Sequence, residues 1–327
     1  MRNFMRWGLA ALALCAAIGF GLYALVVPDS DKDKPILLVP KTIDGRIDFW
    51  QVLGQGALTA AKEFGEEIQT VGTVSESDID GQIALLEKAI ETKPKAIVLA
   101  ASDYNRIVPV AEKIRAAGIP LVTVDSGLNG GISESFIATD NYEAGKQAGD
   151  ALMQVIGKDD RIAIISVVKV SATAIERERG ARDSLRAAGA TNVAEETYYS
   201  NSSETVAFDI ASRLLADMPD LKGIVCLNEP TTVGAAKAVR EHAASRGIKM
   251  VGFDSSTDEV AFLEEGIIQA IVVQKPFNMG YLAVRTAVSA SKGKKVEPMI
   301  DTGSQVITKE NMYAKENQKL LFPFDGG

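Results

Sequence analysis

Short apolar runs rich in β-branched residues alternate along this chain with amphipathic helical patterns, at intervals of about 25–35 residues. The first series of runs covers residues 35–40, 67–73, 95–101, 120–125 and 135–140, and the second covers 161–168, 193–199, 223–228, 249–254 and 270–274. Apolar runs joined by helices in this way predict parallel strands that are covered on both faces. Two such series predict an α/β fold with two doubly wound parallel-sheet lobes.

The N-terminal segment predicts the compartment in which the lobes work. Residues 7–27 form 21 consecutive positions without a charged side chain, and Arg2 and Arg6 precede them. A basic stub before an apolar run is typical of an export signal or a membrane anchor. The run reaches the roughly 20 residues that a spanning helix needs, so residues 1–34 are interpreted as a signal peptide or membrane anchor plus a linker. An uncleaved anchor, simple cleavage and lipidation at Cys15 stay open, and each places the remainder in the periplasm or at the outer face of the cytoplasmic membrane.

The composition disfavours several classes of protein. A net charge of −8 argues against a nucleic-acid partner, which requires a basic face. The single histidine, His242, argues against histidine-rich metal sites and against a catalytic pair of Ser or Cys with His. Gly54-Gln55-Gly56 lacks the G-x-G-x-x-G spacing of a nucleotide loop, since the third position is Thr59. We therefore expect no enzyme activity, no cofactor and no metal.

Candidate binding residues follow from the predicted sheets. Ligands of open parallel sheets bind beyond the carboxyl ends of the strands, and two lobes can face these ends across a cleft. The side chains that follow the predicted strands are Phe49, Trp50, Ser102, Asp103, Asp125, Ser126, Asn141, Arg177, Arg179, Asn228, Glu229, Asp254 and Gln274. Carboxylate, amide and guanidinium groups can each bond two neighbouring hydroxyls, and aromatic faces accept the apolar face of a pyranose ring. Asp and Asn are also common helix caps and turn formers, so a single such residue is weak evidence for a site. Polar side chains follow many of the predicted strands, however, and this recurrence predicts a neutral polyhydroxylated ligand.

Five segments add a resemblance to this pattern. They are TDNYEAGKQAGDAL (139–152), SATAIERERGARDSL (171–185), CLNEPTTVGAAKAV (226–239), VGFDSS (251–256) and AIVVQKPFNMG (270–280). In this order and spacing they resemble the ribose-type family of periplasmic sugar-binding proteins, the type I two-lobed receptors of ABC transporters. The resemblance covers Pro35 to about Met312. It implies that the chain crosses between the lobes near 139–141, 274–276 and 303–305, which gives a first lobe of residues 35–140 and 276–303 and a second lobe of residues 141–275 and 304–327.

The resemblance also implies which side chains bind the ligand. Phe49 and Trp50 resemble the family's paired aromatics, Asp125 resembles the carboxylate that takes two sugar hydroxyls, and Arg179 resembles the ligand-binding arginine. The remaining members of the implied site are Ser126, Asn141, Asn228, Asp254 and Gln274.

Three positions depart from the family's pattern. Ile47-Asp48 stands where Asn-Pro is common, Ser126 stands where an arginine follows the aspartate, and Glu229 stands where an aspartate follows the asparagine. The change at Ser126 removes one cationic donor. Because Lys41 or Arg46 is also expected near the pocket mouth, the identity of the sugar stays open.

The resemblance implies a solute-binding protein that captures a sugar or sugar-like ligand between its lobes and presents it to the permease of an ABC importer. The alternative is a membrane-anchored sensing subunit that signals to a chemoreceptor or histidine kinase. In both cases the ligand shifts an equilibrium between open and closed lobes. We expect a monomer, because the cleft must open and close freely. Trp50, the only tryptophan beyond the N-terminal segment, should report occupancy.

Overall fold

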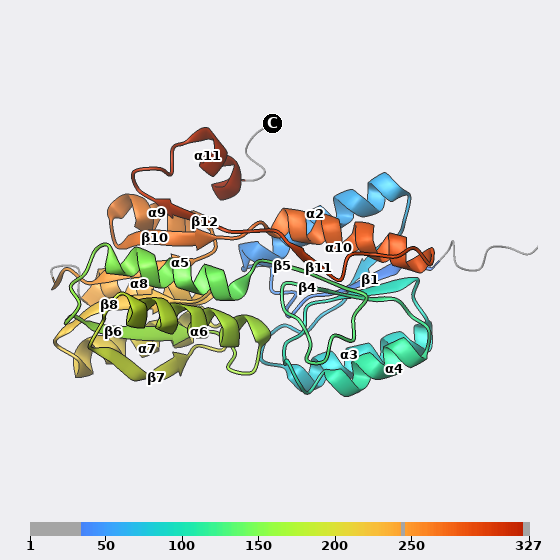
Figure 1. Cartoon of the computed structure of the whole chain (residues 1–327), viewed down its shortest axis with the longest axis horizontal. Coiled ribbons are helices and arrows are strands. Elements are labelled where there is room, and N and C mark those ends of the chain that lie inside the picture. Colours follow the sequence, from blue (N-terminus) through green and yellow to red (C-terminus); the bar gives the residue numbers. More distant parts are fainter. Residues whose placement is uncertain (1–33, 243–245, 323–327) are drawn as a thin grey trace, which may run out of the picture. The chain divides into compact units, whose positions relative to one another are not determined.

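Two six-stranded sheets organise the chain (Figure 1). The computed structural model describes residues 34–242 and 246–322, and from Pro35 onward these form one compact unit. The strand order is β11-β5-β4-β3-β1-β2 in the first sheet and β12-β10-β9-β8-β6-β7 in the second. All neighbours pair in parallel except β10 and β12, which are antiparallel. The predicted two-lobe α/β fold is confirmed, with each lobe built on one sheet.

The strands and helices of the first lobe are β1 (Ile36–Val39), α2 (Asp48–Phe64), β2 (Ile68–Thr70), α3 (Ile79–Thr92), β3 (Ala96–Leu99), α4 (Val108–Ala116), β4 (Leu121–Val124), β5 (Ser135–Ala138), α10 (Pro276–Ser291) and β11 (Met299–Asp301). Those of the second lobe are α5 (Asn141–Met153), β6 (Arg161–Ser166), α6 (Ala172–Ala187), β7 (Val193–Tyr199), α7 (Glu204–Asp217), β8 (Leu221–Cys226), α8 (Glu229–His242), β9 (Lys249–Phe253), α9 (Thr257–Glu265), β10 (Ile268–Val273), β12 (Gln305–Thr308) and α11 (Lys315–Leu321).

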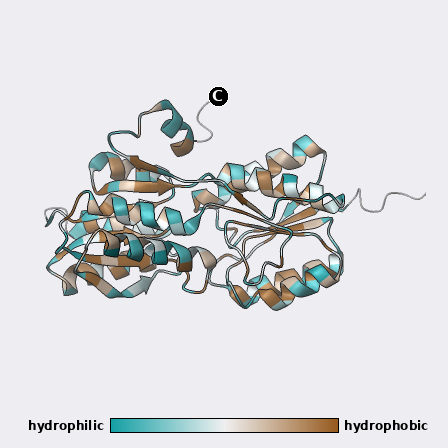
Figure 2. Cartoon of the chain, in the orientation of Figure 1, coloured by the Kyte–Doolittle hydropathy of each residue, from teal (hydrophilic) through white to brown (hydrophobic). Residues whose placement is uncertain are grey.

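Helices cover both faces of each sheet, which explains why the strands are apolar throughout. In the first lobe α2 and α10 pack on one face and α3 and α4 on the other. In the second lobe α5 and α6 cover one face and α7, α8 and α9 cover the other. Figure 2 shows the resulting pattern, with hydrophobic strands between helices that carry hydrophilic residues.

Every apolar run predicted as a strand forms one, whereas β11, β12 and α11 were not predicted. These three elements are short, and β11 is partly exposed, so their sequences lack the apolar periodicity of the rest. The chain passes between the sheets after β5, after β10 and after β11. The residue limits given above for the lobes stay a prediction.

The predicted signal peptide or anchor falls within residues 1–33, outside the described residues. Across the ranges that the structure describes, no helix is long and apolar enough to cross a membrane.

Two glycines bring α5 and α6 into close contact. A Cβ atom added to Gly145 would lie 2.2 Å from the backbone oxygen of Arg177, and one added to Gly180 would lie 2.0 Å from the backbone oxygen of Tyr142. Only residues without a side chain allow this approach. The contact holds the first turns of α6 beside the N-terminal residue of α5, Asn141.

Candidate ligand-binding site

A small cavity lies where segments that follow strands of both sheets meet. It has a volume of about 20 Å³ and is lined by Lys41, Ile47, Phe49, Trp50, Glu76, Asp125, Val167, Thr173, Arg177, Asn228, Glu229, Pro230, Asp254 and Gln274. This space holds about one water molecule, so a sugar ring requires movement of side chains or lobes. A second, larger cavity of about 450 Å³ adjoins it and shares Ile47, Glu76, Glu229 and Pro230 with it.

The two predicted aromatics, Phe49 and Trp50, lie in the first turn of α2 at the wall of the small cavity. Their rings are in edge-to-face contact, with centroids 5.0 Å apart and an interplanar angle of 86°. Trp50 is 6% exposed, and its Nε1 donates to Glu76 Oε1 at 2.8 Å. Glu76, in the loop after β2, also accepts from Ser202 of the second lobe at 2.7 Å. The indole is therefore held in one orientation by a contact that itself links the lobes.

Two aspartates occupy equivalent strand ends in the two lobes. Asp125 follows β4 with φ 60°, and Asp254 follows β9 with φ 76°. Positive φ is costly for residues other than glycine and is concentrated at functional sites. Asp254 accepts from Gln274 Nε2 at 2.6 Å and from the backbone N–H of Glu229 at 3.1 Å. Burial raises the pKa of Asp254, and the positive charge of Arg177 opposes that shift.

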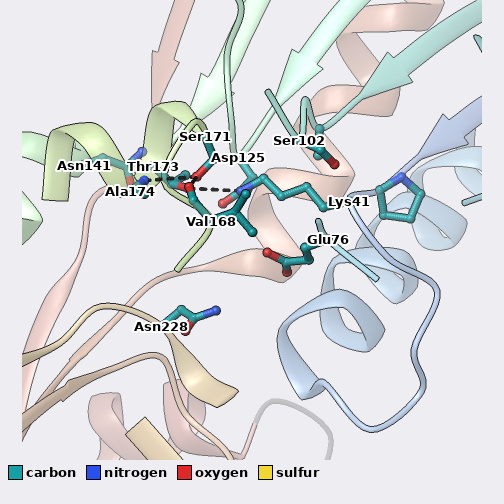
Figure 3. A network of polar contacts seen from close by, with 12 residues as sticks. Lys41, Glu76, Ser102, Asp125, Asn141, Val168, Ser171, Thr173, Ala174 and Asn228 are labelled. Carbon is teal, nitrogen blue, oxygen red and sulfur yellow. Dashed lines mark hydrogen bonds and ion pairs between the residues drawn. The ribbon is translucent and has the colours of Figure 1, made fainter. Parts of the chain in front are cut away.

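Lys41 joins the first aspartate to the second lobe (Figure 3). Its Nζ lies 2.8 Å from Asp125 Oδ2 and donates to Thr173 Oγ1 at 3.0 Å. The ammonium also lies 5.9 Å from the ring centroid of Trp50, within the range of a cation–π contact. Lys41 is only 3% exposed, so this polar group is inside the site rather than at its mouth as expected.

The arginine that lines the cavity is Arg177, whereas Arg179, which the resemblance implies as the ligand-binding arginine, does not line it. Arg177 is 2% exposed, and its guanidinium donates to Asn141 Oδ1 and to the backbone oxygen of Leu227, both at 2.8 Å. Its Cζ stacks over the Phe253 ring at 4.6 Å. Arg179 lies two residues further along the helix, which turns it away from the cavity, and its exposed guanidinium contacts Glu176 and the ring of Tyr142.

Two further residues of the site implied by the resemblance do not line the cavity, and neither do the candidates that follow β3, Ser102 and Asp103. Asn141 is buried behind Arg177, where its amide oxygen accepts from the guanidinium and its Nδ2 donates to the backbone oxygen of Thr139 at 3.1 Å. Its role in this arrangement is to orient Arg177. Ser126 is fully buried next to Asp125, and its hydroxyl does not reach the cavity wall. The other predicted residues, Phe49, Trp50, Asp125, Asn228, Asp254 and Gln274, do line the cavity.

Glu229 caps a helix of the opposite lobe. The N-cap residue of α2 is Ile47, whose side chain offers no acceptor. The carboxylate of Glu229 instead accepts from the backbone N–H groups of Asp48 and Phe49, both at 3.0 Å. These are N–H groups that a helix leaves without internal partners, and a carboxylate is favoured there by the helix dipole. Burial nevertheless raises the pKa of Glu229 to about 8, against the lowering effect of these two hydrogen bonds.

Three polar lining side chains were absent from the predicted set of strand-end residues: Lys41, Glu76 and Thr173. Lys41 comes two residues after β1, and Glu76 lies in the loop between β2 and α3. The rule that ligands bind beyond the carboxyl ends of the strands, called here the strand-end rule, finds both when it is extended to longer loops. Thr173 is the second residue of α6 and carries no sequence signal of its own. In the described ranges, no group of three or more His, Cys, Asp or Glu side chains is arranged to hold a metal ion.

Comparisons with known proteins identify the family to which the chain is similar. Residues 36–295 match the family described as periplasmic binding protein domain. The D-ribose/D-allose-binding protein of Pseudomonas aeruginosa is 26% identical over 312 residues, which cover 92% of this chain and 97% of that protein.

Two solved structures are similar to most of the chain. A carbohydrate transporter solute binding protein from Agrobacterium radiobacter, in complex with D-arabinose, has a TM-score of 0.84 at 29% identity and covers 88% of this chain and 98% of its own. An ABC transporter solute binding protein from Agrobacterium vitis with bound D-fucose has a TM-score of 0.83 at 33% identity, with coverages of 88% and 99%. The family match spans most of the sequence, and the fold is similar to that of these two solute binding proteins. The chain therefore belongs to the periplasmic binding protein domain family.

Proposed function

We propose that this protein captures a neutral polyhydroxylated sugar between its two lobes and presents it to an ABC importer. The observation that carries the proposal is the cavity at the strand ends, where two aromatic rings stand beside buried carboxylate, amide and guanidinium groups. The named ligands of similar proteins, D-ribose, D-allose, D-arabinose and D-fucose, are all neutral sugars.

The two lobes contribute different groups to this site. The first lobe offers the Trp50 and Phe49 rings and the carboxylate of Asp125, and the second offers Arg177 and Asn228. A sugar that bonds both sets gains its full contacts only when the lobes are closed, so binding shifts the equilibrium towards closure. The closed form is what the permease of the importer would recognise.

The same proposal covers location and assembly. The lobes work in the periplasm or at the outer face of the cytoplasmic membrane, to which residues 1–34 deliver or anchor them. The protein works as a monomer, with no nucleic-acid partner and no cofactor. The lobes comprise residues 35–140 with 276–303, and 141–275 with 304–327.

Isothermal titration calorimetry with a panel of pentoses and hexoses tests the function. The panel includes D-ribose, D-allose, D-arabinose and D-fucose, and a thermal-shift screen run beside it widens the search. A bound sugar should raise the melting temperature with increasing concentration, because it binds only the folded state. Absence of binding and of any thermal shift across the whole carbohydrate panel would reject the proposal.

A further inference from the structure

Lys41 supplies a cation beside Asp125. The residue that follows Asp125 in the sequence is Ser126, which carries no charge and whose hydroxyl does not line the cavity. Lys41 reaches the same carboxylate from the end of β1, with its Nζ 2.8 Å from Asp125 Oδ2. Figure 3 shows the lysine extending across the site to Asp125 and Thr173.

Lys41 is buried between the two lobes and is not part of an incidental contact at the surface. The side chains of Lys41 and Asp125 are each only 4% exposed. The ammonium has three N–H donors, and two of its neighbours, Asp125 and Thr173, come from different lobes. Lys41 also lines the cavity, together with Trp50.

We propose that Lys41 determines ligand specificity: its ammonium and the Asp125 carboxylate form a donor–acceptor pair that binds adjacent hydroxyls of a neutral sugar and disfavours sugar acids. This inference rests on the proposed function and specifies its ligand class. A hydroxyl can accept from the ammonium and donate to the carboxylate at the same time. Charge-assisted bonds of this kind are stronger than those between neutral groups.

The charges around the cavity explain why an anionic ligand is disfavoured. The lining carries two cations, Lys41 and Arg177, and four carboxyl groups, Glu76, Asp125, Glu229 and Asp254. Each cation already faces a carboxyl group, because Lys41 pairs with Asp125 and the charge of Arg177 acts on Asp254. The raised pKa values of Glu229 and Asp254 show that burial already disfavours negative charge here. A sugar carboxylate would add another anion without an unpaired cation to receive it.

The first experiment compares neutral sugars with their acids by calorimetry on the wild-type protein. The probes are D-ribose, D-allose, D-arabinose and D-fucose, with D-gluconate and D-glucuronate as acids. We expect at least one neutral sugar to bind about 100-fold more tightly than either acid, the effect expected when a buried charge lacks a partner. An acid that binds as tightly as the best neutral sugar overturns the inference.

The second experiment removes the cation with K41M, which keeps most of the length of the side chain. Loss of a charge-assisted bond should weaken binding of the best neutral sugar about 10-fold to 100-fold. The matched control is K95M, because Lys95 forms a partly buried pair with Glu66 just before β3, at the opposite end of the same sheet. K95M should leave affinity within about twofold of wild type, as expected for a site outside the ligand contacts.

Deoxy analogues of the best sugar distinguish direct contact from a structural role. For the one hydroxyl that Lys41 binds, the deoxy sugar should lose affinity for wild type but not for K41M, a non-additive result. Equal losses for every analogue in both proteins mean that Lys41 only supports the fold, which overturns the inference.

Loss of the buried cation leaves Asp125 unpaired, so K41M itself can fail to fold. In that case the double variant K41M/D125N, which removes both charges, is measured instead and should show at least the same loss. Sugar affinity within about threefold of wild type in K41M or in the double variant also overturns the inference. If the wild-type protein binds no sugar, the proposed function fails and this inference fails with it, whereas normal sugar binding by the variants refutes the role of Lys41 alone.

Discussion

At the scale of single residues, the site depends on which face of a helix or loop each side chain occupies. Arg177 and Arg179 are two positions apart on α6, and only Arg177 points to the cavity. The resemblance pointed to Arg179 of the ERERG segment, whereas the cavity is lined by Arg177 of the same segment. The contact of α6 with α5 at Gly145 brings the backbone of Arg177 close to α5.

Replacement of Arg177 should therefore weaken sugar binding, whereas replacement of Arg179 should not. For Arg177→Ala we expect a loss of about 10-fold to 100-fold, as for a charged hydrogen-bond donor. For Arg179→Ala we expect affinity within about twofold of wild type, because exposed ion pairs contribute little. Titration followed by Trp50 fluorescence measures both, with circular dichroism to verify that each variant is folded. Equal losses in the two variants would contradict the placement of Arg177.

At the scale of elements, the glycine contact between α5 and α6 positions the arginine. Gly145→Ala would place a Cβ atom 2.2 Å from the backbone oxygen of Arg177. Overpacking of this kind should destabilise the protein by ~1–3 kcal/mol and lower sugar affinity as the arginine shifts. The control is Gly54→Ala in α2, where no atom lies within 4 Å of the added Cβ. That change should stabilise the helix by ~0.5–1 kcal/mol. Urea denaturation measures both, and a neutral Gly145→Ala would refute the tight contact.

Burial of Glu229, the residue that caps α2, gives the protein a pH-dependent stability. The pKa of Glu229 is about 8 in the folded protein and near 4.5 in the unfolded chain. Between these values the folded state holds the proton more firmly, so this contribution to stability is greatest below about pH 4.5 and is lost as the pH rises through about 8. The carboxyl groups of Asp48 and Asp254 face Glu229, and burial raises their pKa values in the same direction.

Glu229→Gln isolates the part due to this residue, because the amide keeps one acceptor oxygen and carries no charge. The stability of the wild type relative to the variant should fall from about pH 5 to about pH 8.5. Urea denaturation midpoints at several pH values measure this difference. Denaturation midpoints that change with pH in the same way in both proteins would show that Glu229 does not titrate in this way.

The sheets and several residues at the strand ends could be predicted from the sequence alone, because buried strands leave a clear pattern in it. Strands such as β3 and β8 are buried on both faces, so their sequences are continuous apolar runs. The strand-end rule then located Asp125, Asp254 and Gln274 without a structure. It did not identify Lys41 or Glu76, which reach the cavity from loops whose paths depend on packing. The cap of α2 by Glu229 joins residues about 180 positions apart, and no local pattern encodes such a contact.

At the scale of the whole molecule, polar contacts already join the two lobes directly. Lys41 bonds Thr173, Glu76 accepts from Ser202, and Glu229 accepts from the backbone of Phe49. These contacts surround the small cavity and form only when the lobes are close together. We expect them to contribute to closure together with the ligand, so that sugar affinity reflects both sets of interactions.

The central claim is that one sugar molecule binds between the lobes at the facing strand ends. A crystal structure of the protein with the tightest-binding neutral sugar tests it most directly. The account predicts that the ring lies against Trp50 and that its hydroxyls bond Asp125 and Lys41 from the first lobe and Arg177 and Asn228 from the second. A sugar bound to one lobe only, or held outside these residues in the larger outer cavity, would contradict it.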